Sequence, residues 1–241
     1  MTARRADAGD RLPALPWRLT GMVVRPTPTL TAAIAHGAWA TVWLAGLLLW
    51  AGAAGALLST PVGQQALVDE RVRIVEAFGG EVDDATYEGW QAQPPVLTYL
   101  TSGGRVWLLP PVTLAVALGL LAAARRHGAP VSFRQVLAVV THANVALVLQ
   151  QLVATPLHYG RESLTGASNV AALVPMVEEG TALALWLGSI DLFGLWWLWL
   201  LAVGLGLVTA RPSRGWFVRL VAAYFVLAAV AALVVGLTGG S

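Results

Sequence analysis

Five long apolar stretches constrain this chain more than any other feature of its sequence. A helix that crosses about 30 Å of hydrocarbon needs roughly 20 predominantly apolar residues. Because a spanning segment must satisfy its own backbone hydrogen bonds, such stretches predict an all-α, polytopic membrane bundle of five transmembrane helices. The predicted spans are residues 37–58, 106–124, 135–155, 181–208 and 216–237.

The composition excludes the main alternatives to a membrane protein. Hydrophobic residues make up 57% of the 241 residues, and charged residues make up only 12%. A soluble domain carries about 25% charged residues, so this chain has too little charge to cover a soluble surface. The chain has no cysteine, which excludes disulfides and thiolate sites. Its 15 basic residues, all arginine, lie mostly in short segments between the apolar runs, which argues against nucleic acid as a partner.

Arginine is distributed unevenly between the two sides of the predicted bundle. The segment before the first span and the loops after the second and fourth spans are rich in arginine, whereas loops 59–104 and 156–180 are acidic. Arginine-rich loops stay in the cytoplasm. The sequence therefore predicts that the N-terminus lies inside the cell and the C-terminus outside.

The chain divides into a short arm and one membrane domain. Residues 1–26 are rich in Arg, Asp and Pro and are expected to form a loose cytoplasmic arm, and residues 27–241 form the membrane domain. In the outer loop, 59–104, the pair Thr60-Pro61 is typical of a helix start, and valines follow on one face. This pattern predicts an amphipathic helix, for which contact with the membrane and a solvated position are equal alternatives.

Ionisable side chains inside two predicted spans are candidate functional residues. Asp191 is the only acid deep within a predicted span, and it lies roughly 15 Å from the outer end. His142 lies roughly 12 Å from the inner end of the third span, at nearly the same depth. Because a charge at this depth costs at least about 2.5 kcal/mol, such residues indicate a functional site by default.

One face of the third span carries further polar side chains. Thr141, Asn144 and Gln151 recur at spacings of three and seven residues, which places them together on the helix. We expect Asp191 to accept hydrogen bonds from Thr141 or Asn144, or to pair with His142. A buried clamp between two helices is the favoured interpretation. A proton or ion relay, or a headgroup site, is the alternative.

No enzyme motif accompanies these groups. The sequence has no His-Glu-x-x-His zinc motif and no glycine-rich phosphate loop. Gly188-Ser189-Ile190 lacks the second glycine of a rhomboid-type serine site. The four histidines and Asp191 form no catalytic constellation. We therefore expect no catalytic residue, no cofactor and no metal site.

Arginines at the predicted inner surface form a second candidate site. Arg125 and Arg126 follow the second span, and Arg211 and Arg214 follow the fourth. Arginine binds anionic headgroups through two hydrogen bonds, and each basic residue beside an anionic leaflet gains about 1 kcal/mol. We expect membrane lipids as partners, with other membrane proteins or a second copy of the chain as further candidates.

Three stretches of the sequence carry a resemblance to a known family. The first opens the third predicted span with a capping box, in which Ser132 and Gln135 satisfy each other's backbone N–H groups. The third contains Asp191 and an Asp-aliphatic-Phe-x-aliphatic-Trp run. The stretches are 132–140, then 155–163 followed by Asn169 and 173–175, and finally 190–196 running into 201–205.

With these stretches the chain resembles bacterial members of the Yip family, five-span membrane proteins related to the Rab-interacting proteins of the eukaryotic Golgi. The resemblance covers roughly residues 24–238. It implies five spans, the orientation given above, and a multi-pass location in the bacterial inner membrane. We expect a non-enzymatic scaffold that organises membrane or binds partner proteins. The alternative is a small transporter, channel or lipid translocator that uses Asp191 and the polar face of the third span.

Overall fold

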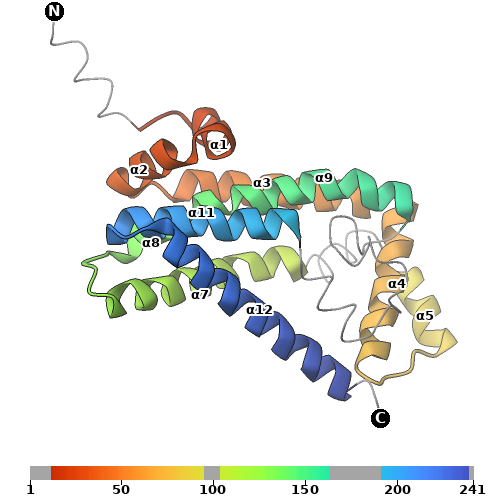
Figure 1. The fold of residues 1–241 in the computed structure, drawn as a ribbon. Helices are drawn as coiled ribbons and strands as arrows, with labels where there is room; N and C mark the ends of the chain where they lie inside the picture. The colour runs from red at the N-terminus through yellow and green to blue at the C-terminus, as the bar shows by residue number, and fades with distance from the viewer. Residues whose placement is uncertain (1–11, 95–103, 163–190, 239–241) are drawn as a thin grey trace, which may run out of the picture.

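Figure 1 shows the fold in the computed structural model, which describes residues 12–94, 104–162 and 191–238. Five of the helices, α3, α7, α8, α9 and α11, run along one direction, while α4 and α5 cross one end and α12 slants away. The helices are α1 (Leu15–Val24), α2 (Pro26–His36), α3 (Ala40–Leu58), α4 (Pro61–Ala77), α5 (Asp84–Gln91), α7 (Gly104–Arg126), α8 (Phe133–Ala143), α9 (Val145–Arg161), α11 (Leu192–Thr209) and α12 (Ser213–Thr238).

Five helical segments of the described chain are long and apolar enough to span a membrane. The third consists of α8 and α9 together, which are interrupted only at Asn144. The all-α bundle with five candidate spans is therefore confirmed, whereas its orientation across the membrane stays a prediction. The candidate spans are Ala40–Leu58, Val106–Arg126, Phe133–Gly160, Leu192–Thr209 and Ser213–Val234.

The fourth span differs most from its prediction. Helix α11 begins at Leu192, and the part of the predicted span 181–208 before Asp191 lies outside the described residues. Asp191 has an extended backbone and is the N-cap of α11, so the prediction that it lies deep within a helix is wrong. At 1.5 Å per residue α11 is about 27 Å long. Asp191 therefore lies at one end of this span. The prediction placed it deeper because apolar composition alone does not show where a helix begins.

Helix α8 is the central, most buried part of the bundle. The predicted capping box is present: the Ser132 hydroxyl accepts from the Gln135 N–H at 3.3 Å, and the Gln135 side chain accepts from the Ser132 N–H at 3.0 Å. Every residue from 136 to 143 is buried. Val139 packs closely on α11, because a Cβ atom at Gly204 would overlap its side chain. Helices α8 and α11 therefore form the close-packed centre of the bundle.

Helix α1 lies inside the segment that we expected to be a loose arm, so that expectation is wrong for Leu15–Val24. Leu15, Leu19 and Met22 follow one face of the helix at spacings of four and three residues. Met22 is fully buried, and α1 packs against α2, α3, α8 and α9. This short apolar stripe is enough to fix the helix to the bundle, although charged segments flank it.

The predicted helix of the outer loop is confirmed as α4, which begins after Thr60. The Thr60 hydroxyl accepts from the Gly63 N–H at 3.0 Å, as an N-cap does. Helix α4 packs against α3, α5, α9 and α12. The Gln65 side chain of α4 donates to the Tyr87 hydroxyl of α5 at 2.9 Å, so the two helices form a polar hairpin.

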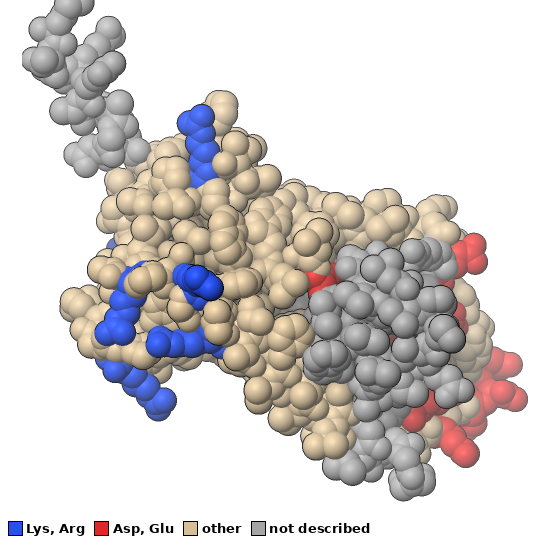
Figure 2. Space-filling view, in the orientation of Figure 1, with Lys and Arg blue, Asp and Glu red and all other residues tan. Residues whose placement is uncertain are grey.

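Charge is separated along the bundle. Figure 2 shows arginine gathered at the end formed by the α7–α8 and α11–α12 connections, and most aspartate and glutamate gathered at the end with α4 and α5. The uneven distribution of charge along the sequence therefore corresponds to a separation of charge between the two ends of the bundle. This polarity is the one expected of a membrane protein with its arginine-rich end inside.

Candidate intramembrane polar site and arginine surface

Asp191 joins the third and fourth spans. Its Oδ1 accepts from the N–H groups of Phe193 and Gly194 at 2.6 and 3.1 Å, and its Oδ2 accepts from the Gln150 side chain at 2.9 Å. The carboxyl oxygens are the acceptors in these three bonds. Asp191 therefore caps α11 and ties it to α9.

The side chain of Gln150 donates to Asp191, whereas the expected partners Thr141, Asn144 and His142 bond other groups. The third and fourth spans run antiparallel, so the first residue of α11 lies opposite the second half of the third span. Thr141 lies nine residues before Gln150, or about 13 Å along the helix axis. The expected partners therefore lie too far along the third span to reach Asp191, because Asp191 is at the end of the fourth span.

Asn144 forms a second polar contact, which links three helices. Its Nδ2 donates to the Thr113 hydroxyl of α7 at 3.3 Å, and its Oδ1 accepts from the Trp197 indole N–H of α11 at 2.9 Å. Asn144 is placed at the junction between α8 and α9, where its side chain reaches both neighbours. The amide of Asn144 therefore acts both as a donor and as an acceptor, which is typical of structural hydrogen bonds inside a helical bundle.

The remaining predicted residues bond within their own helix. Thr141 donates to the Leu137 carbonyl oxygen at 2.9 Å, and the Gln151 side chain donates to the Thr155 hydroxyl at 3.2 Å. His142 is fully buried, and its Nδ1 bonds the Ala138 carbonyl oxygen at 2.8 Å. The structure therefore does not bring the predicted residues together into one site.

Sequence reasoning missed Gln150, Thr113 and Trp197. Gln150 lies about 100° around the helix from Gln151, so only the rotation of the helix distinguishes the two amides. A buried tryptophan carries an N–H that needs an acceptor. That requirement, applied to the tryptophans of the fourth span and the amides of the third, was the available signal for the Asn144–Trp197 pair.

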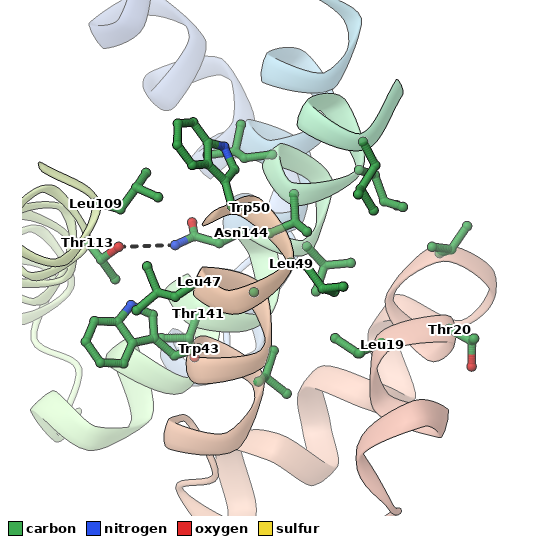
Figure 3. A pocket seen from close by; sticks show the side chains of 18 residues that line it. Leu19, Thr20, Trp43, Leu47, Leu49, Trp50, Leu109, Thr113, Thr141 and Asn144 are labelled. Atoms are coloured by element: carbon green, nitrogen blue, oxygen red, sulfur yellow. Dashed lines mark hydrogen bonds between the residues drawn. The ribbon is translucent and has the colours of Figure 1, made fainter. Parts of the chain in front are cut away.

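A pocket of about 200 Å³ lies beside Asn144, among α1, α3, α7 and the third span. Figure 3 shows the Asn144–Thr113 hydrogen bond at its wall, with Trp43 and Trp50 of α3 nearby. Its lining is almost entirely apolar. A pocket of this kind suits a hydrocarbon chain.

The arginine surface is partly fixed by hydrogen bonds. Arg211 donates to the His127 carbonyl oxygen at 3.0 Å, and Arg125 contacts the Val131 carbonyl oxygen at 3.5 Å. Arg126 and Arg214 are exposed. Arg211 thus links the α11–α12 connection to the α7–α8 connection, whereas headgroup binding by these arginines stays a prediction.

His127 connects the α7–α8 connection to α12. Its Nε2 accepts from the Arg219 guanidinium at 3.0 Å, and its ring meets the edge of Trp216. Burial and the charges of Arg219 and Arg211 lower the pKa of His127 below its usual value, which keeps the ring neutral at pH 7. A neutral ring is the acceptor that Arg219 requires.

Comparison with known proteins identifies the chain. The Yip1 domain model matches residues 20–236, a range that contains all five candidate spans. A search of curated proteins finds no match, and neither does a search of solved structures. The match covers nine-tenths of the chain, and the fold is the helical membrane bundle that the resemblance implies. The chain therefore belongs to the Yip1 domain family and is a multi-span membrane protein.

Proposed function

We propose that this Yip1-domain protein is a non-enzymatic scaffold of the bacterial inner membrane, which gathers anionic lipid at its arginine-rich end. Proteins of the family are generally non-enzymatic and act in membrane trafficking. The observation that carries the proposal is the charge separation along the bundle, with arginine at one end and acidic side chains at the other. A surface of this kind attracts the anionic headgroups of the cytoplasmic leaflet.

The geometry of the arginine surface supports lipid binding. Arg211 and Arg219 are held against the α7–α8 connection through His127, so the two connections form one surface. Arg126 and Arg214 extend from it and are exposed. Guanidinium groups in this position can form paired hydrogen bonds with phosphate oxygens.

The transporter alternative has less support. Asp191 and Asn144 are used in hydrogen bonds that join helices, and the pocket beside Asn144 is apolar. An ion pathway needs polar groups that follow one another through the membrane. Partner proteins or a second copy of the chain stay candidates, for which the exposed apolar face of α12 offers a surface.

Loss of the exposed arginines is expected to weaken the response to anionic lipid. The double variant Arg126→Gln/Arg214→Gln removes about 1 kcal/mol of lipid attraction per residue, or roughly 30-fold in affinity for the pair. The measurement is the rise in melting temperature that phosphatidylglycerol, but not phosphatidylcholine, gives in detergent. We expect a clear rise for the unmodified chain, a much smaller one for the variant, and suppression of the rise by salt.

Arg73→Gln is the control for position, because the half-buried Arg73 lies on α4 at the acidic end of the bundle. The measured quantity is the shift caused by lipid, so a change in starting stability does not affect the comparison. An equal shift in the unmodified chain, the double variant and the control would contradict the proposed lipid-binding surface.

A further inference from the structure

Arg18 of α1 is a buried cation with unused hydrogen-bond donors. Its side chain is only 4% exposed, and its Nη2 donates to the Thr41 hydroxyl of α3 at 2.6 Å. Its Nε and Nη1 are also buried and have no hydrogen-bond partner among the described residues. Burial lowers the pKa of Arg18, and no acid of the described chain offsets this effect. A buried guanidinium in this state requires an anion.

His142 supplies an unused acceptor in the same region. Its Nδ1 bonds a carbonyl oxygen, so Nδ1 carries the proton and Nε2 has a free lone pair. Nε2 is buried and has no partner. The two side chains do not bond each other. Helices α1 and α8 pack against each other, so two neighbouring helices carry buried donors and a buried acceptor that are unused among the described residues.

The surroundings of these groups suit a lipid. The apolar pocket of about 200 Å³ is lined by Leu19, Val42 and Thr141, the sequence neighbours of Arg18, Thr41 and His142, and not by those three residues themselves (Figure 3). Helix α1 also exposes apolar side chains, as expected of a helix that lies in the membrane interface. These are Trp17, Val23 and Val24.

We propose that Arg18 and His142 bind the phosphate monoester of one membrane lipid of the phosphatidic acid type, whose acyl chain occupies the pocket beside Asn144. The singly protonated phosphate has oxygens that accept from Arg18 and a hydroxyl that donates to His142 Nε2. Because the unused nitrogens are covered by protein atoms, the phosphate reaches them when α1 moves outward from α3. This site goes beyond the proposed function, since it does not involve the exposed arginines.

Native mass spectrometry of the detergent-solubilised full chain tests the site with three probes. Phosphatidic acid is expected to bind as one molecule per chain, at least about tenfold more tightly than phosphatidylcholine with the same acyl chains. Binding should persist in high salt, because a buried charge is poorly screened. Inorganic phosphate should neither bind nor compete. Equal binding of phosphatidylcholine, or binding of inorganic phosphate alone, would overturn the proposal.

Two variants separate this site from the arginine surface. Arg18→Gln keeps the length of the side chain but loses its charge, and it is expected to weaken phosphatidic acid binding at least about tenfold. Arg126→Gln, an exposed arginine at the same end of the bundle, should leave the salt-resistant lipid in place. Equal losses in both variants would overturn the proposal. If Arg18→Gln does not fold, the comparison of the three probes on the unmodified chain decides.

Discussion

Replacement of Asp191 by leucine is expected to be one of the two most destabilising single changes considered. The variant loses the N-cap of α11, which is worth about 1–2 kcal/mol. It also removes the Asp191 acceptor of the half-buried Gln150 amide, which costs about 1 kcal/mol. The measurement is the melting temperature in detergent, followed by circular dichroism.

Asp191→Asn is the matched variant. Asparagine caps helices about as well as aspartate, and its oxygen can still accept one of the bonds. We expect it to retain most of the stability that leucine loses. If asparagine were as damaging as leucine, the charge of Asp191 and not its hydrogen bonding would be essential, and the transporter alternative would gain support. A double-mutant cycle with Gln150→Leu measures the coupling between the two side chains.

Asn144→Leu is expected to have an effect of similar size. This change breaks two hydrogen bonds that join α7, α9 and α11, and it leaves the Thr113 hydroxyl and the Trp197 indole N–H unpaired. Each unpaired group costs about 1–3 kcal/mol. Lower melting temperature in detergent, together with altered tryptophan fluorescence, is the expected result.

Gln151→Leu serves as the control for Asn144. The amide of Gln151 bonds Thr155 one turn further along the same helix, so its loss does not separate helices. We expect only a small change in melting temperature for this variant. A loss as large as that of Asn144→Leu would show that polarity in the third span, rather than the three-helix contact, stabilises the bundle.

The spans could be predicted because their physical requirement is simple. A segment must be long and apolar enough to cross the hydrocarbon, and both properties are visible in the sequence. The capping box of Ser132 and Gln135 is equally local, so its spacing alone predicts it. These features need no knowledge of how distant segments pack.

The polar contacts could not be predicted to the same extent. The partner of Asp191 depends on where α11 begins and on the register between α9 and α11, and hydropathy determines neither. Asn144 was a correct candidate, but its partners Thr113 and Trp197 come from two other helices. Hydrogen bonds between helices depend on the rotation of each helix about its axis and on its depth in the membrane. An apolar sequence determines neither.

The sequence contains a signal for the burial of Arg18 that our prediction did not use. We counted Arg18 only as one of the basic residues before the first span, which support the predicted orientation of the bundle across the membrane. Its spacing places it on the same helical face as Leu15, Leu19 and Met22, which is the buried face of α1. An arginine within an apolar stripe is unusual because burial of its charge needs a partner.

The orientation of the bundle is tested most directly by cysteine accessibility, because the chain contains no cysteine of its own. Gly89 of α5 and Gly215 of α12 are exposed, and neither has a neighbouring atom that a new Cβ would meet. In intact cells, a membrane-impermeant thiol reagent is expected to label Gly89→Cys at once and Gly215→Cys only after permeabilisation. Labelling of Gly215→Cys in intact cells, with protection of Gly89→Cys, would place the arginine surface outside and contradict the proposed scaffold at the cytoplasmic leaflet.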